Sequence, residues 1–291
     1  MSAAPSSIAA TATIGGLLAE IAARLNAAGI AEPRREARLV VALGLEVDPS
    51  VVMGWPERAV APEAAATIGR LAARRARGEP LSRLRGKREF WSLDFALSAE
   101  TLDPRPDSET LIEAALADIA DRGAALRIVD FGTGTGCLLL ALLSELPRAR
   151  GIGIDISPGA VAVACSNAAA LKLDRRAAFR RGGWDARIEG GADVILANPP
   201  YIPTSEIGRL APEVAGFDPP MALNGGPDGL DAYRALGPAI RRLLARSGRA
   251  YLEIGAGQGP QVARILAESG LRVAALWADL AGIERCVIAT L

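Results

Sequence analysis

Residues 126–143, LRIVDFGTGTGCLLLALL, contain the turn that decides the fold. A short apolar run at 126–131 precedes the glycine-rich segment 132–136, and an apolar helical pattern follows at 137–146. Glycine allows the backbone to turn tightly and to approach a ligand closely, while the start of a helix offers free N–H groups. The stretch therefore predicts a strand, a ligand-binding turn and a helix.

The spacing of the glycines indicates the kind of ligand. A dinucleotide-binding turn has its third glycine where this chain has Cys137, whereas the third glycine here is Gly136. This GxGxG spacing fits a nucleoside cofactor without pyrophosphate better than it fits NAD. A glycine-rich turn that binds no ligand is the alternative. The expected cofactor-binding residues of the turn are Gly132, Thr133, Gly134, Thr135 and Gly136.

Strand and helix patterns alternate through the rest of the chain. Helical patterns at 137–146 and 159–171 separate short apolar runs, which predicts βαβ units, a parallel sheet and an α/β fold. Two late runs, 273–277 and 285–290, predict an antiparallel hairpin at the edge of the sheet. The other expected strands are 126–131, 151–156, 192–197 and 249–254.

The first 85 residues have a different pattern. Apolar residues recur at helical spacing at 14–25, at 33–44 and from Pro62 to just before Gly78, which predicts a small helical bundle. Looser alternation at 89–97 predicts a hairpin. The expected domains are an N-terminal helical domain at 1–85, a hairpin linker at 86–106 and an α/β domain at 107–291.

Composition excludes several classes of protein. The chain has 291 residues, is 50% hydrophobic and contains no histidine, so imidazole catalysis, a Ser/His/Asp triad and a histidine-ligated metal site are excluded. Its three cysteines, Cys137, Cys165 and Cys286, are far apart, and we expect neither a metal site nor a disulfide. No apolar run reaches about 18 residues and no signal-peptide pattern is present. We expect a soluble, cytoplasmic protein.

The overall charge is balanced. The 33 basic and 33 acidic residues give a net charge of zero, which argues against strong non-specific binding to nucleic acid or membrane. A locally basic stretch nevertheless runs from Arg70 to Arg88. It is either a docking surface for a partner protein or a solvated helix face.

Two residues near the expected sheet edge could complete a nucleoside site. Asp155 ends the strand after the glycine turn, where an acid can accept hydrogen bonds from both ribose hydroxyls. The alternative is a helix cap, a role for which Ser157 competes. Trp184, in the loop before the strand at 192–197, could flank an adenine ring or simply cover the sheet edge.

The most specific motif is Asn198-Pro199-Pro200-Tyr201, which directly follows an apolar strand. The prolines end the strand and stiffen the backbone, and the carbonyls before them remain free as acceptors. With the side-chain oxygen of Asn198 they can accept both protons of an –NH2 group, on which Tyr201 could stack. Such acceptors stabilise positive charge that develops on a planar nitrogen as it attacks an electrophilic methyl group.

The segment after this motif, 203–229, resists assignment because prolines and glycines interrupt every pattern. A structureless loop of this length in a compact domain is usually functional or disordered. It directly follows the most specific motif in the chain.

In this order, GTGTG, Asp155 and NPPY resemble class I S-adenosylmethionine-dependent methyltransferases that act on an exocyclic or amide nitrogen. More specifically, nearly the whole chain resembles the bacterial release factor glutamine methyltransferases. The segments that carry this closer resemblance are GEP at 78–80, REFWSL at 88–93, TLDPRPD at 101–107 and FDP at 217–219. Asp103 and Phe131 depart from the residues usual in that family.

The resemblance implies a doubly wound, mostly parallel seven-stranded methyltransferase sheet preceded by a helical bundle that contacts the protein substrate. It implies methylation of the side-chain amide nitrogen of glutamine in the Gly-Gly-Gln motif of peptide chain release factors, with S-adenosylmethionine as cofactor. The implied catalytic residues are Asn198, Pro199 and Tyr201, joined by Pro200 for substrate binding. The implied cofactor-binding residues are Gly132 to Gly136, Asp155, Trp184 and Asn198.

Two other functions remain open on the sequence. A DNA or RNA base amino-methyltransferase would share NPPY, because adenine N6 is also a planar –NH2, but it is expected to carry a basic face. A cofactor-binding module without catalysis is the second alternative, and the intact NPPY argues against it. We expect a monomer with no metal, no membrane and no stable nucleic-acid partner.

Overall fold

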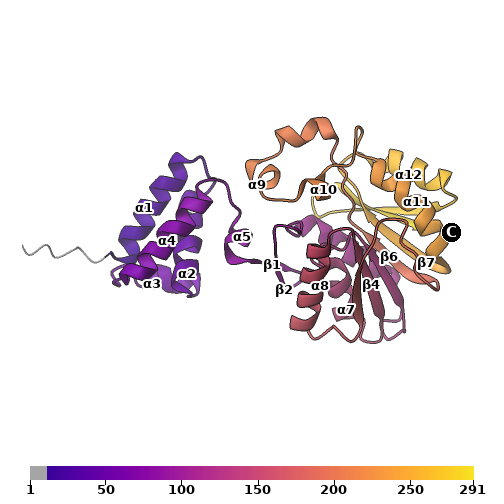
Figure 1. The fold of residues 1–291 in the computed structure, drawn as a ribbon, viewed down its shortest axis with the longest axis horizontal. Helices are drawn as coiled ribbons and strands as arrows, with labels where there is room; N and C mark the ends of the chain where they lie inside the picture. Colours follow the sequence, from indigo (N-terminus) through magenta and orange to yellow (C-terminus); the bar gives the residue numbers. More distant parts are fainter. Residues whose placement is uncertain (1–11) are drawn as a thin grey trace, which may run out of the picture. The chain divides into compact units, whose positions relative to one another are not determined.

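A computed structural model describes residues 12–291, which form two compact units (Figure 1). Unit 1 contains the described residues up to Arg85, and unit 2 is Gly86–Leu291. The units have separate hydrophobic cores and are described separately. No helix among residues 12–291 is long and apolar enough to cross a membrane.

Unit 1 is helical, as the apolar spacing predicts. Helix α1 (Ile14–Ala27) starts at Thr13, whose hydroxyl accepts a hydrogen bond from the backbone N–H of the third residue along. Helices α2 (Pro33–Leu45) and α4 (Pro62–Arg75) start with proline, which has no N–H to leave unpaired. Two short helices, α3 (Pro49–Gly54) and α5 (Leu81–Arg85), were not predicted, because such short segments cannot display a repeating apolar face.

The core of unit 1 is aliphatic. Leu25, Val40 and Ile68, one from each long helix, are completely buried. Gly44 allows α2 and α4 to approach closely, since a Cβ atom there would lie only 2.4 Å from Cγ1 of Ile68. A close-packed core of this kind explains why the unit needs no disulfide or metal.

Part of the basic stretch is engaged inside unit 1. Nε of Arg75 donates to Oε2 of Glu36 at 2.7 Å and links α4 to α2, with Arg75 only 5% exposed. Nε of Arg74 donates to Glu79 at 2.8 Å. The stretch is therefore not a continuous free basic surface.

Unit 2 is built on a seven-stranded, mostly parallel sheet, which confirms the α/β prediction. Its strands are β3 (Arg127–Phe131), β4 (Arg150–Asp155), β5 (Ala177–Arg181), β6 (Ala192–Ala197), β7 (Leu244–Glu253), β8 (Arg272–Ala278) and β9 (Glu284–Thr290). The spatial order is β5-β4-β3-β6-β7-β9-β8, with β9 antiparallel to both of its neighbours. The predicted terminal hairpin of β8 and β9 forms, and of its two strands β8 is the one at the sheet edge.

Helices cover both faces of the sheet, so the fold is doubly wound (Figure 1). They are α6 (Glu109–Asp118), α7 (Cys137–Glu145), α8 (Pro158–Ala170), α11 (Asp231–Leu243) and α12 (Gly259–Glu268). Leu111 of α6 and Leu139 of α7 belong to one core cluster, whereas Tyr233 of α11 and Val262 of α12 belong to the other.

The predicted hairpin consists of β1 (Lys87–Phe90) and β2 (Leu93–Ala96), which pair antiparallel within unit 2. Its phenylalanines, Phe90 and Phe95, are buried in the core beside α6 and α7. The buried side chain of Asn167 on α8 fastens it further: Oδ1 accepts from Ala96 N at 2.8 Å, and Nδ2 donates to Ala96 O at 3.2 Å. The hairpin is thus an integral part of unit 2.

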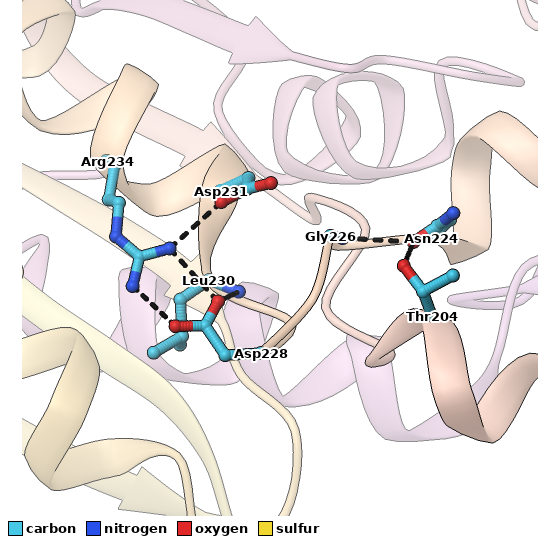
Figure 2. Close-up of polar contacts among 7 residues, drawn as sticks. All are labelled: Thr204, Asn224, Gly226, Asp228, Leu230, Asp231 and Arg234. Atoms are coloured by element: carbon cyan, nitrogen blue, oxygen red, sulfur yellow. Dashed lines mark hydrogen bonds and ion pairs between the residues drawn. The ribbon is translucent and has the colours of Figure 1, made fainter.

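The segment 203–229 has regular structure that the sequence did not reveal. It contains the 3-10 helix η2 (Thr204–Arg209) and the short helices α9 (Pro212–Ala215) and α10 (Pro220–Leu223). Figure 2 shows how it closes on itself: Oδ1 of Asn224 accepts from the Thr204 hydroxyl at 2.8 Å and from Gly226 N at 3.0 Å. Single turns that start with proline carry no apolar repeat, so pattern analysis could not find them.

Candidate active site

A cavity of about 300 Å³ lies at the carboxyl ends of the central strands of unit 2. Ligands bind at this edge in open α/β sheets because the loops there diverge from a switch in strand order. The glycine turn after β3, Asp155 at the end of β4, Trp184 after β5 and Asn198 after β6 all line it. Four segments that are distant in sequence therefore meet at one cavity.

The glycine turn has a backbone that only glycine adopts readily. Gly132, Gly134 and Gly136 have φ angles of +69°, +53° and +81°, in the left-handed region. At Gly132 a Cβ atom would lie 3.1 Å from the Trp184 ring, so a side chain there would meet the indole. The turn needs its glycines both for its path and for the close approach of Trp184.

Asp155 is fixed by two backbone donors. Oδ2 accepts from Gly134 N and Oδ1 accepts from Ser157 N, each at 2.9 Å. The helix cap is Ser157, whose hydroxyl accepts from Ala160 N at 3.1 Å. A carboxylate has about four acceptor positions, so Asp155 retains capacity for hydroxyl donors in the cavity.

Two polar atoms beneath the turn lack partners among the described residues: Oδ1 of Asp130 and Oγ1 of Thr135. Asp130 is completely buried, its other oxygen accepts from the Thr133 hydroxyl at 2.5 Å, and burial raises the pKa of its carboxyl to about 7. Thr135 lines the cavity. Because buried polar atoms are seldom left unpaired, the hydroxyl of Thr135 marks a place for a polar ligand group.

Within the NPPY motif, the structure separates cavity residues from supporting ones. Asn198 and Pro200 line the cavity, whereas Pro199 and Tyr201 are not among its lining residues. The Tyr201 hydroxyl points to Glu253 of β7, donating to Oε1 at 3.3 Å, and burial is the main cause of the raised pKa of Tyr201. The Tyr201 hydroxyl therefore joins the motif to β7, and Tyr201 does not line this cavity.

The side chain of Asn198 is oriented by one hydrogen bond. Its Nδ2 donates to Oγ of Ser108 at 3.1 Å. Ser108 is itself buried and ends the 3-10 helix η1 (Pro106–Ser108). With the nitrogen engaged there, the oxygen Oδ1 is the atom that Asn198 offers to the cavity as an acceptor.

Sequence reasoning missed several residues of the site. Glu100 lines the cavity and its Oε2 accepts from the Ser157 hydroxyl at 2.8 Å. Ser108 and Glu253 are also new. Glu253 offered a signal, since an acid at the end of an apolar strand that reaches a ligand-binding edge is rarely there by chance. Nothing in the sequence around Glu100 or Ser108 connects them to residues so far along the chain.

The RPD and FDP segments meet beside the cavity. Arg105 forms an ion pair with the buried carboxylate of Asp218, which also accepts from the backbone N–H of Asp103 at 3.1 Å. The neighbouring prolines, Pro104 and Pro219, line the cavity. This contact anchors the segment 203–229 at the mouth of the site.

Among residues 12–291, no three His, Cys, Asp or Glu side chains are grouped to hold a metal ion. The site pairs a nucleoside-type pocket with a fixed acceptor for a planar –NH2 group. A doubly wound sheet with these two features defines the class of S-adenosylmethionine-dependent amino-methyltransferases.

Comparisons with known proteins give the particular family. The profile "PrmC N-terminal domain" matches residues 16–86, and "Methyltransferase small domain" matches residues 88–211. A release factor glutamine methyltransferase of Rhodospirillum rubrum is 50% identical over 276 residues, covering 95% of this chain and 84% of that relative. Those of Cereibacter sphaeroides and Moorella thermoacetica are 44% and 40% identical, covering 92% and 95% of this chain and 95% and 98% of theirs. The chain belongs to the release factor glutamine methyltransferase family.

Its cofactor is S-adenosylmethionine. The residues present fit this cofactor on three observations. The three left-handed glycines of the turn carry no side chain, Asp155 retains acceptor positions, and the Thr135 hydroxyl has no hydrogen-bond partner among the described residues. The GxGxG spacing, which disfavours a dinucleotide, agrees with a ligand that has no pyrophosphate.

Proposed function

We propose that this protein methylates the side-chain amide nitrogen of the glutamine in the Gly-Gly-Gln motif of peptide chain release factors. The relatives named above are release factor glutamine methyltransferases. The observation that carries the proposal in this chain is Asn198, whose nitrogen is engaged by Ser108 while its oxygen is left for the cavity. An acceptor in that place can bind an –NH2 group through its protons, whereas a carbon nucleophile has no such proton to donate.

The proposed role of the NPPY residues follows from the electronics of an amide. The lone pair of an amide nitrogen is delocalised, so this nitrogen is a poor nucleophile. Asn198 Oδ1 and the carbonyls of Asn198 and Pro199 accept its protons, which orients the nitrogen and stabilises the positive charge that develops on it. The nitrogen would gain one bond to the methyl carbon as the S–C bond of the bound cofactor breaks. The sulfur would leave as a neutral thioether, and the nitrogen would release one proton to water. Tyr201 keeps the motif rigid through Glu253.

We propose that the cofactor is held by Gly132 to Gly136, Asp155, Trp184 and Asn198. When bound, S-adenosylmethionine supplies an electrophilic methyl group. The backbone N–H groups at the start of α7 suit an anionic group, Asp155 suits the ribose hydroxyls, and the indole of Trp184 suits a flat base. Apart from Gly136, which lets the turn enter α7, these residues line one cavity of unit 2.

We also propose that unit 1 docks the release factor, and that the protein works in the cytoplasm as a monomer without a stable nucleic-acid partner. Unit 1 has its own hydrophobic core. It carries two large exposed apolar side chains, Met53 and Trp55, of the kind that protein interfaces favour.

The test is mass spectrometry of a bacterial release factor after incubation with this protein and S-adenosylmethionine. The expected result is a mass gain of one methylene unit, mapped to the glutamine of Gly-Gly-Gln. Omission of the protein, and a release factor whose glutamine is replaced by asparagine, are the controls. Methyl incorporation into DNA or RNA, with none on the release factor, would instead support a base amino-methyltransferase.

A further inference from the structure

Glu253 is a buried acid at the active site that the mechanism above leaves largely unused. It ends β7, is 2% exposed, and its Oε2 has no hydrogen-bond partner among the described residues. Its other oxygen accepts from the Tyr201 hydroxyl at 3.3 Å. A buried carboxyl with an incomplete set of partners costs stability, so its presence calls for a functional reason.

Ser108 lies between Glu253 and Asn198. The hydroxyl of Ser108 accepts from Nδ2 of Asn198 at 3.1 Å, and its interaction with the Glu253 side chain favours the ionised form of that carboxyl. A hydroxyl has one proton to donate and two lone pairs with which to accept. When Ser108 accepts from Asn198, its own proton is therefore free to point to Glu253.

We propose that Glu253 is a positioning residue that sets the orientation of the Asn198 amide through the hydroxyl of Ser108. This inference rests on the proposed function and deepens it. An ionised carboxyl can only accept, so Ser108 donates to it and must accept from Asn198. The Nδ2 end of Asn198 then faces Ser108, and Oδ1 faces the cavity, where it can accept a proton of the substrate amide.

The opposite state of Glu253 reverses the chain of hydrogen bonds. A protonated carboxyl donates to Ser108, whose own proton then turns toward Asn198. The Asn198 amide then rotates so that Oδ1 accepts from Ser108 and Nδ2 faces the cavity. A donor in that place opposes the –NH2 group of a glutamine, so the site loses its acceptor although no residue has changed.

The charge on Glu253 is sensitive to pH near neutrality. Burial is the largest effect and raises the pKa of its carboxyl to about 7, while contacts with Ser108 and Tyr201 and the charge of Arg285 lower it. We expect the rate to fall as pH falls through about 7, because the productive orientation needs the ionised form. The titratable or charged groups that face Glu253 are Tyr201, Asp107 of η1, Cys137 of α7, Tyr233 of α11, and Arg285 and Cys286 of β9.

The first experiment replaces the acid by its amide, Glu253→Gln, in the full chain. Glutamine can donate to Ser108 at every pH, so kcat on a Gly-Gly-Gln peptide should fall on the order of 10²-fold. The affinity for S-adenosylmethionine should stay within about twofold. The loss of rate of the wild-type protein below about pH 7 should disappear.

Asp118→Asn is the matched control. Asp118 of α6 is also an acid that accepts from a tyrosine, Tyr251, at 3.0 Å, but it pairs with Arg249 away from the cavity. This variant should keep the wild-type pH profile. A Glu253→Gln protein with wild-type kcat and an unchanged pH profile would overturn the inference.

A double variant tests whether Glu253 acts through Ser108. Ser108→Ala alone breaks the connection, so adding Glu253→Gln to it should reduce kcat no further. Multiplied effects would mean that the two residues act independently, which also overturns the inference.

A measurement without turnover separates this inference from the proposed function. The side-chain amide of Asn198, followed by ¹⁵N NMR with S-adenosylmethionine absent, should titrate with the same midpoint as the Glu253 carboxyl and cease to titrate in Ser108→Ala. If wild-type protein shows this titration but methylates no glutamine, the proposed substrate is wrong and the positioning role stands. If the Asn198 signal does not change with pH, Glu253 has no positioning role, whichever substrate the protein methylates.

Discussion

At the scale of single residues, two acceptors of the site, Asp155 and Asn198, are each oriented by hydrogen bonds. Asp155 is fixed by two backbone N–H groups, whereas Asn198 is fixed by the side chain of Ser108. The first arrangement is as rigid as the loop itself, and the second depends on a hydroxyl that can rotate. The orientation of Asp155 thus depends on the backbone, whereas that of Asn198 depends on a side chain.

The first prediction concerns Asn198→Ala. The change removes the acceptor for the substrate nitrogen but leaves the glycine turn and Asp155 intact, so kcat should fall on the order of 10²-fold or more. The affinity for S-adenosylmethionine, measured by calorimetry, should change little. Asn26→Ala, an exposed change on α1, is the control. Retention of the wild-type methylation rate in the Asn198 variant would refute its assignment.

The second prediction concerns pH and stability. Burial raises the pKa of Asp130 from 3.8 to about 7 in the folded protein, so its contribution to stability is complete below about pH 4 and is lost progressively as pH rises to about 7. Between these two pH values, Asp130 alone should lower the free energy of unfolding by about 1.4 kcal/mol per pH unit. Asp130→Asn should remove this pH dependence from the free energy of unfolding, measured with urea between pH 4 and 8 without cofactor.

The control for this prediction is Asp94→Asn, an exposed carboxyl on β2 that pairs with Lys87. It should keep the slope of the wild-type protein. If Asp130→Asn keeps that slope as well, Asp130 does not carry the raised pKa.

Sequence reasoning was strongest where the chemistry is contiguous. NPPY and GTGTG each occupy consecutive positions, so their residue types and spacing could be interpreted directly. Ser108 contacts a residue 90 positions away, and no local pattern predicts such a pair. The motif also could not show that the Tyr201 hydroxyl contacts Glu253, because that depends on how β7 places this residue.

At the scale of elements, the side chain of one buried residue joins a helix, a hairpin and a turn. Asn167 joins three segments, since its Nδ2 also donates to Thr135 O of the glycine turn at 2.9 Å. The β1–β2 hairpin, helix α8 and the cofactor turn thus share one buried amide. Pattern analysis predicted the hairpin and the helix but not this junction, because it saw each as an isolated segment.

The third prediction concerns this junction. Asn167→Ala removes three hydrogen bonds, of which two hold Ala96 of the hairpin. At about 1 kcal/mol net for each of these two, the hairpin should open roughly 30-fold more often. Hydrogen exchange of peptides that cover residues 87–96 should accelerate accordingly. Exchange in unit 1 should be unaffected, which provides an internal control. Unchanged protection of the hairpin would show that Phe90 and Phe95 suffice to hold it.

At the scale of the whole molecule, the chain divides into two compact units with separate hydrophobic cores. Every residue of the cavity belongs to unit 2, and a separate family profile matches unit 1. The sequence indicated both the bundle and the parallel sheet, since long elements with regular apolar spacing dominate each. It could not place β9 between β7 and β8, because strand order depends on packing between distant segments.

The fourth prediction concerns a fragment of residues 86–291. It contains the complete cavity and its own core, so it should bind S-adenosylmethionine with nearly the affinity of the full chain. It should methylate a short Gly-Gly-Gln peptide at a rate similar to that of the full chain but an intact release factor far more slowly. Equal rates on the intact release factor would remove the docking role proposed for unit 1.

The position of β9 has a consequence for how the protein is made. A ribosome delivers β8 before β9, yet in the finished sheet β8 pairs with β9 and not with β7. Until residues 284–290 emerge, β7 presents an open edge to which a neighbouring nascent chain can add a strand. The bundle of unit 1 has emerged long before that point. The seven-stranded sheet can therefore close its order only after β9, the last strand described, has been synthesised.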